Sequence, residues 1–148
     1  MNDWMIDSVD YIFIGALGLL SVIALWLALE RYFYYKHIDL NSFSHKEELE
    51  IALGENLTML ASIGSNAPFI GLLGTVVGIM VTFVTIGQSG LIETKEIMVG
   101  LALALKTTAG GILVAIPTIW FYNLLTRRAE IIAAKWEVLQ KRKGSGPE

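Results

Sequence analysis

Three long apolar runs constrain what this chain of 148 residues can fold into. They cover residues 11–29, 67–87 and 98–125, and Lys106 is the one charged residue inside them. A helix needs about 20 apolar residues to cross a hydrocarbon core of about 30 Å, so each run is long enough to span a bilayer. We therefore predict an all-α membrane protein with three transmembrane helices, organised as a single membrane domain over residues 1–148.

Lysine and arginine are distributed unevenly around these runs. None precedes the first run, three follow it, one lies between the second and third runs, and six follow the third. Short loops rich in these residues remain in the cytoplasm during membrane insertion. We therefore expect the N-terminus outside, and both the loop of residues 30–62 and the C-terminus in the cytoplasm.

The expected cytoplasmic loop carries a helical pattern of its own. Leu49, Leu53, Leu57 and Leu60 recur at helical spacing among charged residues, which predicts one amphipathic helix over residues 45–60. Packing against another part of the bundle or against a neighbouring subunit is the simplest role for this helix, and a regulatory role is the alternative.

The third transmembrane helix is expected to continue into the cytoplasm as a C-terminal helix over residues 126–143. This segment places Ile132, Trp136 and Leu139 on one side of a helix. The short segment between the second and third runs predicts a tight hairpin. The ending GSGPE, residues 144–148, resembles a remnant of a cloning vector.

Small and hydroxyl-bearing residues follow steps of three and four along the second and third runs, so they share one side of each helix. They are Pro68, Gly71, Thr75, Gly78, Thr82 and Thr85 on the second run, and Gly100, Ala104, Thr108, Gly111, Ala115 and Thr118 on the third, with Thr107 at the edge of the stripe. Gly74 and Gly78 also form a GxxxG motif. Such residues let membrane helices approach closely. They would equally suit a narrow polar path, because threonine hydroxyls both donate and accept hydrogen bonds.

Neither stripe contains a side chain that titrates near neutral pH. A proton-driven device built from this chain would therefore need a carboxylate on a partner's helix, facing the threonines. The chain has no cysteine, and His37 and His45 lie outside the runs, so we expect no metal site and no cofactor. No base, nucleophile and orienting group can be assembled from the runs, which argues against an enzyme.

Lys106 lies nearly opposite the Thr108 stripe on a helical wheel. A lysine at the centre of a membrane span costs about 2.5–3.5 kcal/mol on insertion scales, so it needs an explanation. Two interpretations remain open. The lysine is structural, reaching toward the outer surface or pairing with a neighbour, or it tunes ion passage electrostatically.

The segments NAPFIGLLGTVVGIMVTF (66–83) and ALKTTAGGILVAIPTIWFYN (104–123) resemble the two signature blocks of the ExbB/TolQ/MotA proton-channel family. The resemblance implies a stator of the bacterial inner membrane, in which a homopentamer of this subunit surrounds a dimer of a single-span partner. By this resemblance Thr75 and Thr108 correspond to the family's paired path-lining threonines. Pro117 corresponds to the proline of its AIP element, and Asn123 to its asparagine at the cytoplasmic end.

Two positions depart from the family pattern. Leu103 stands where ExbB and TolQ usually have a glutamate, so the role of that glutamate is not carried over to this chain. Lys106 stands where an apolar residue is usual. The AIP and YN elements favour ExbB or TolQ over the flagellar branch, and they favour ExbB slightly over TolQ.

The leading hypothesis is an ExbB-like subunit that conducts protons along Thr75 and Thr108, with Thr107 and Thr82 on the same path. A partner of the ExbD or TolR type would supply the intramembrane aspartate, and a TonB-type protein would use the work for uptake across the outer membrane. Membrane lipid is the expected surrounding, and no nucleic acid is expected to bind. The alternatives are a TolQ-like subunit of the Tol-Pal system, a passive membrane scaffold, and a subunit of a small-solute transporter.

Overall fold

The computed structural model describes residues 3–90 and 94–145, and within these residues all regular structure is helical. Its elements are α1 (Asp3–His37), the short 3-10 helix η1 (Leu40–Ser42), α2 (Lys46–Gly54), α3 (Leu57–Ser89) and α4 (Thr94–Gly144). Three helices are long and apolar enough to cross a membrane. The prediction of an all-α membrane fold with three spanning helices is therefore confirmed.

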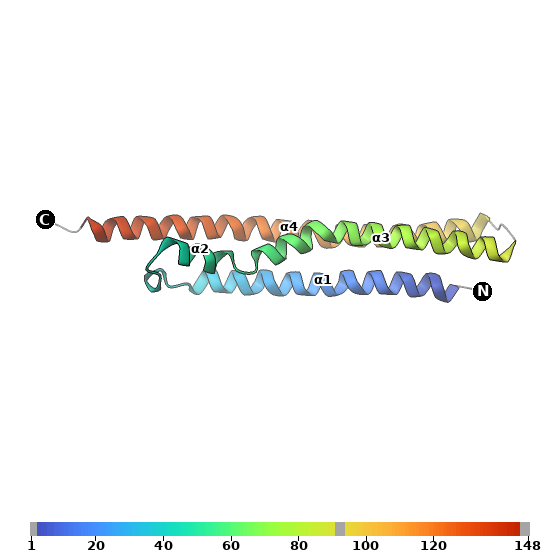
Figure 1. The fold of residues 1–148 in the computed structure, drawn as a ribbon, viewed down its shortest axis with the longest axis horizontal. Helices are drawn as coiled ribbons and strands as arrows, with labels where there is room; N and C mark the ends of the chain where they lie inside the picture. Colours follow the sequence, from blue (N-terminus) through green and yellow to red (C-terminus); the bar gives the residue numbers. More distant parts are fainter. Residues whose placement is uncertain (1–2, 91–93, 146–148) are drawn as a thin grey trace.

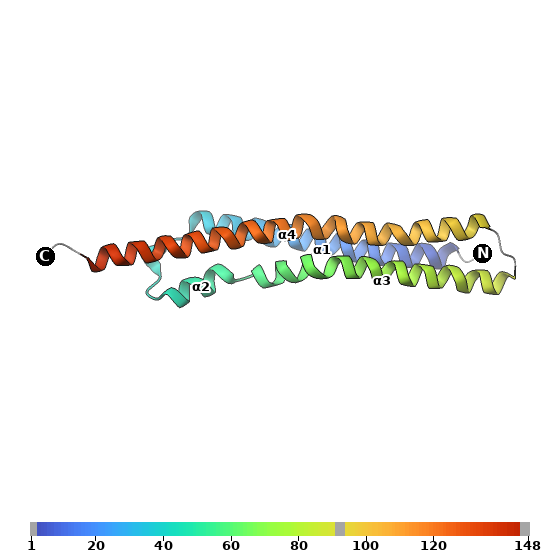
Figure 2. The ribbon, with the colours of Figure 1, turned by 90° about the horizontal axis from the view of Figure 1, so that it is seen from above.

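The three long helices lie side by side in an elongated bundle (Figure 1 and Figure 2). Helices α1 and α4 run in the same direction, α3 runs antiparallel to both, and α2 lies beside the C-terminal half of α4. The most extensive packing is between α3 and α4. The hairpin expected between these two helices falls partly on residues 91–93, which lie outside the described residues.

Helix α4 is unbroken over 51 residues, which corresponds to a length of about 77 Å. This length exceeds the hydrocarbon thickness of a bilayer by more than twofold. The predicted helical continuation of the third span over residues 126–143 is therefore present, and it includes the buried Trp136.

A cluster of large apolar side chains forms the core at the α2 end of the bundle. All four leucines of the predicted amphipathic pattern, Leu49, Leu53, Leu57 and Leu60, are buried in this core. Trp136 of α4 packs there too, and its indole N–H donates to the carbonyl oxygen of Phe43 at 3.3 Å. The leucine pattern thus identified a buried face correctly.

The outer faces of the long helices carry exposed apolar side chains instead of charges. Residues that are more than half exposed include Trp26, Phe69, Met80, Leu113 and Ile116. A protein in water would not leave such a continuous apolar surface uncovered. These faces therefore fit contact with lipid chains or with other subunits.

The expected single helix over residues 45–60 is interrupted, which corrects the sequence interpretation. Helix α2 ends at Gly54, Asn56 adopts a left-handed backbone conformation with φ of 63°, and α3 begins at Leu57. The last leucines of the pattern thus belong to the spanning helix α3. The predicted cytoplasmic loop 30–62 is shortened further because α1 continues to His37.

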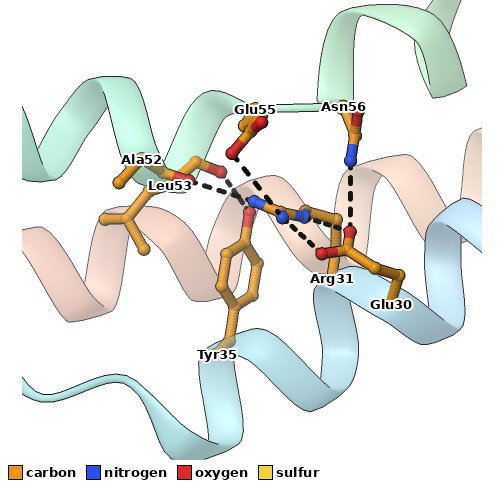
Figure 3. Close-up of polar contacts among 7 residues, drawn as sticks. All are labelled: Glu30, Arg31, Tyr35, Ala52, Leu53, Glu55 and Asn56. Atoms are coloured by element: carbon orange, nitrogen blue, oxygen red, sulfur yellow. Dashed lines mark hydrogen bonds and ion pairs between the residues drawn. The ribbon is translucent and has the colours of Figure 1, made fainter.

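Side chains of α1 stabilise this break because they cap the C-terminal end of α2 (Figure 3). Arg31, which is only 3% exposed, donates to the carbonyl oxygen of Ala52 at 3.0 Å, and the hydroxyl of Tyr35 donates to the carbonyl oxygen of Leu53. The last carbonyl groups of a helix have no partner within the helix, so α2 can end here without leaving them unsatisfied.

Acidic and aromatic neighbours compensate the buried charge of Arg31. Its guanidinium donates two hydrogen bonds of 2.5 Å to the carboxylate of Glu30 and lies 4.5 Å from the ring centroid of Tyr34. Glu30 also accepts a hydrogen bond of 3.2 Å from the side-chain amide of Asn56 (Figure 3). The Glu30–Arg31 pair therefore joins α1 to both sides of the α2–α3 break, Arg31 to the end of α2 and Glu30 to Asn56.

The left-handed conformation of Asn56 gives a test of this junction. Asn56→Ala and Asn56→Gly both remove the hydrogen bond to Glu30, but only alanine places a Cβ atom in the left-handed region. We expect alanine to destabilise the protein by about 1 kcal/mol more than glycine does. Thermal unfolding in detergent compares the two variants, and equal melting temperatures would contradict a strained turn.

Candidate functional site

The two stripes of small residues face each other where α3 packs against α4. A Cβ atom added to Gly71 would lie 2.5 Å from the carbonyl oxygen of Thr107, and one added to Gly111 would lie 2.5 Å from the carbonyl oxygen of Ala67. Both neighbours are backbone atoms, so neither can move aside without moving a helix. We call this contact between α3 and α4 the glycine seam.

Small residues continue the seam toward the N-terminal end of α4. There Gly78 lies against Ala104, and Gly100 lies against Thr82, whose hydroxyl donates to the carbonyl oxygen of Gly78 at 2.8 Å. Thr82 is 3% exposed, and Ala104 is buried as well. Close backbone approach therefore extends along the apolar part of both helices.

Three threonine hydroxyls form a connected cluster inside the seam. The Thr75 hydroxyl lies 2.5 Å from the Thr108 hydroxyl and 3.3 Å from the Thr107 hydroxyl, and in both pairs either oxygen can donate. The carbonyl oxygen of Ala104 at 2.8 Å is an alternative acceptor for the single proton of Thr75, and that of Gly71 at 3.0 Å is an alternative acceptor for the proton of Thr107. The hydroxyls thus satisfy one another and the adjacent backbone in an apolar surrounding.

The third helix of the bundle buries Thr107, which a helical wheel of α4 alone could not show. The helical wheel placed it at the edge of the stripe, but it is 1% exposed and is the most deeply buried threonine of the cluster, whereas Thr108 is only partly buried. The reason is the third helix, because α1 covers the side of α4 on which Thr107 lies: Phe13 of α1 reaches Gly74 beside it. The Thr107–Thr75–Thr108 cluster therefore crosses the seam from the α1 side to the opposite side.

Other residues singled out from the sequence take various positions along the helices. Ala115 and Thr118 are buried, and Thr118 donates to the carbonyl oxygen of Val114 at 2.7 Å. Pro68 is partly buried and Pro117 is exposed, and the helices continue through both prolines. Asn123 is exposed on α4, and the Thr85 hydroxyl is buried without a hydrogen-bond partner among the described residues.

An ion pair joins α1 to α4 beside the cluster. The ammonium of Lys106 lies 2.6 Å from Oδ2 of Asp10, and the Lys106 side chain is 54% exposed whereas that of Asp10 is 12% exposed. Pairing with a neighbour was one of the two structural interpretations of Lys106. Asp10 was not identified from the sequence as a site residue, because it precedes the first apolar run. The signal that could have identified it is Lys106, since a lysine within a span calls for an acidic partner at the same depth in the membrane.

A small cavity separates Asp10 from the threonine cluster. Asp10, Leu103 and Thr107 line it, together with the two seam glycines Gly74 and Gly78. Oδ1 of Asp10 is buried and has no hydrogen-bond partner among the described residues. Leu103, the residue that departs from the family pattern, therefore lies beside a carboxylate that α1 supplies.

The chemistry available here is hydrogen bonding and charge compensation in a membrane-spanning bundle. Within residues 3–90 and 94–145, no group of three His, Asp or Glu side chains is placed to hold a metal ion. Hydroxyls that donate and accept in a continuous series can order water or exchange protons with a carboxylate. The seam thus combines close helix packing with hydrogen-bonded hydroxyls, and the polar path stays a prediction.

A sequence model of the MotA/TolQ/ExbB proton channel family matches residues 28–138. The chain belongs to this family. Over 134 residues it is 51% identical to the biopolymer transport protein ExbB-like 2 of Helicobacter pylori (strain ATCC 700392 / 26695), an alignment that covers 90% of this chain and 89% of that protein. The family resemblance identified from the two sequence blocks is therefore confirmed.

Two ExbB proteins extend the comparison. The chain is 46% identical to the biopolymer transport protein ExbB of Helicobacter pylori (strain J99 / ATCC 700824), with 90% of this chain and 92% of that protein covered. It is 45% identical to the ExbB of Aquifex aeolicus (strain VF5), with 90% of each protein covered. This member of the MotA/TolQ/ExbB family is thus similar to ExbB proteins over nearly its whole length.

The glycine seam predicts where an added methyl group is not tolerated. Gly71→Ala and Gly111→Ala place a Cβ atom against backbone, and overpacking of this kind costs about 1–3 kcal/mol. Gly15→Ala is the matched control, because Gly15 lies in a helix with no atom within 4 Å of the added Cβ. We expect thermal unfolding in detergent to show lower melting temperatures for the two seam variants only. Equal melting of all three would contradict the seam.

Proposed function

We propose that this chain is the channel subunit of a proton-motive-force-driven stator in the bacterial inner membrane. In this proposal it acts as an ExbB-like subunit with an ExbD-type partner and energises TonB-dependent uptake across the outer membrane. The observation that carries the proposal is the Thr75–Thr107–Thr108 hydroxyl cluster, which lies inside a seam between two membrane-spanning helices. Membership of a proton channel family supports it.

The partner's role follows from what the seam lacks. The stripes of α3 and α4 carry hydroxyls but no carboxylate, so the proton carrier in this proposal is an aspartate on a single-span helix of the partner. Thr108 is the partly buried end of the cluster, and it is the position from which a hydroxyl can reach a neighbouring helix. Protonation of the partner's aspartate then removes its charge and lets that helix move past the threonines.

The energy available is sufficient for mechanical work. One elementary charge that crosses a potential of 100 mV releases about 2.3 kcal/mol, before any pH gradient is added. In this proposal protons flow from outside to the cytoplasm. The positive-inside rule favours an orientation with the N-terminus outside and the basic C-terminal part of α4 inside. The exposed apolar faces of the helices would then contact lipid and four further copies in a homopentamer.

A passive scaffold is the alternative that a structural observation favours. The seam hydroxyls already bond to backbone carbonyl groups, which is what helix packing alone would require. In that case threonine variants would alter stability without altering proton flux. The TolQ-like alternative shares the proton path and differs only in the protein that receives the work.

Thr108→Val tests the proton path, because it replaces a hydroxyl by a methyl group of nearly equal size. Co-reconstituted with its partner in proteoliposomes, the variant should pass protons at least about tenfold more slowly than the wild type, since one link of the cluster is removed. Thr108→Ser should retain most of the flux. Thr58→Val, at an exposed position of α3, is the control that should leave flux unchanged.

A pull-down tests the partner separately. A tagged chain extracted from its native cells in mild detergent should retain a small single-span protein with one acidic residue in its membrane helix. A TonB-like or Tol-like third component would distinguish the two branches. Recovery of this chain alone, even after crosslinking, would refute the partner carboxylate and favour the passive scaffold.

A further inference from the structure

The ion pair between α1 and α4 holds a carboxylate beside the threonine cluster. Lys106 contacts only one oxygen of Asp10, Oδ2, and leaves the buried Oδ1 without a hydrogen-bond partner among the described residues. A buried carboxylate oxygen normally accepts at least one hydrogen bond, from protein or from water. Oδ1 is therefore an acceptor that the residues described here do not satisfy.

A small cavity lies between Asp10 and the threonine cluster. Asp10 and Thr107 line the same cavity, and Thr107 is the first member of the hydroxyl series that continues through Thr75 to Thr108. The α3 side of the cavity consists of Gly74 and Gly78, which carry no side chain that could shield the carboxylate from the cluster. Asp10 thus lies across this one small cavity from Thr107, the α1 end of the series.

We propose that Asp10 is a proton-binding carboxylate of this chain, which delivers protons to the threonine cluster from the α1 side. This inference rests on the proposed proton-channel function and adds to it a carboxylate of the channel subunit itself. Asp10 would act on the side of the seam opposite to Thr108. The partner's aspartate would receive the proton at Thr108.

The proton balance of the proposed step is simple. Oδ1 takes a proton from water at the outer end of the bundle, and the carboxylate becomes a neutral acid while Lys106 keeps its charge. The acid then releases the proton through a water molecule in the cavity to Thr107. Each hydroxyl turns its single proton from the backbone carbonyl to the next hydroxyl as it accepts the incoming one, and the carboxylate is restored. The series permits this exchange because either oxygen of each hydroxyl pair can donate.

Few charged groups surround Asp10. Lys106 faces it from α4, Asp7 and Tyr11 are the titratable neighbours of the pair on α1, and the cavity-lining residues of α3 are glycines. Lys106 is more than half exposed at its side chain, so it can leave Oδ2 without crossing the core. Asp10 is therefore the carboxylate of this region that combines burial with contact to the cavity.

The test compares variants of the chain co-reconstituted with its partner in proteoliposomes, with proton flux recorded as a function of external pH. We expect Asp10→Asn to lower flux at least about tenfold and to flatten its pH dependence, and Asp10→Glu to retain most of the flux. Asp7→Asn is the matched control, an exposed aspartate one turn away on the same helix, and it should behave like the wild type. Wild-type flux in Asp10→Asn would overturn the inference.

A double variant separates proton binding from simple charge pairing. Asp10→Asn alone leaves the Lys106 ammonium without its partner and can destabilise the protein, whereas Asp10→Asn with Lys106→Met removes both charges. If Asp10 binds the transported proton, the double variant assembles normally and still conducts poorly. Restored flux in the double variant would show that Asp10 is only a counter-ion, and would refute the proposal.

Infrared difference spectroscopy distinguishes failure of this inference from failure of the channel function. On stepwise acidification of the reconstituted complex, the wild type should gain a carboxylic acid C=O band that is missing in the double variant. If the wild type passes no protons, the proposed function fails, and the band still decides whether Asp10 binds a proton. Absence of a band that depends on Asp10 would overturn the inference even in a conducting protein.

Discussion

The backbone contact between Gly71 and Gly111 is the constraint on which the rest of the membrane part depends. With a side chain at either position the helices would move apart, because the atoms opposite are a carbonyl oxygen and a Cα atom that cannot rotate away. Only at this separation does the Thr75 hydroxyl reach both Thr107 and Thr108 on the facing helix. Close packing and the polar connection are therefore two results of the same small residues.

A different kind of interaction holds the other end of the bundle. The glycine seam forms because glycine has no side chain to hold the helices apart. The α2–α3 break depends instead on the long side chains of Arg31 and Tyr35, which donate hydrogen bonds to the carbonyl groups at the end of α2. Large apolar residues surround these contacts and form the main core. Helix α3 is thus fixed by backbone contact along its spanning part and by a polar anchor at its beginning.

Much of this architecture follows from the sequence because it depends on local periodicity. Apolar run length predicts the spans, steps of three and four place Gly71, Thr75 and Gly111 on facing sides, and the leucine spacing identifies a buried face. The break at Asn56 could not be predicted, because Gly54 and Asn56 permit an end of the helix but the contacts from Arg31 and Tyr35 determine it. Arg31 lies 21 positions before Ala52, and Tyr35 lies 18 positions before Leu53, so local periodicity cannot reveal these contacts.

The same limit applies to the candidate site. A helical wheel describes one helix alone, so it placed Thr107 at an edge that α1 in fact covers, and it left Lys106 without a partner. Asp10 lies 96 positions from Lys106, and only the packing of α1 on α4 brings them together. Which residues share a surface of one helix could be predicted, whereas the identity of the third helix beside that surface could not.

The unbroken course of α4 makes it a rigid lever. About 54 Å of continuous helix separates Thr108 from Gly144, so a tilt of one degree about the threonine cluster displaces the far end by about 1 Å. The indole of Trp136 binds the carbonyl oxygen of Phe43 just before α2, and the ion pair between Lys46 and Glu137 attaches α2 itself to this part of α4. A small tilt of α4 at the threonine cluster would therefore displace its C-terminal end by a distance comparable to a side-chain contact.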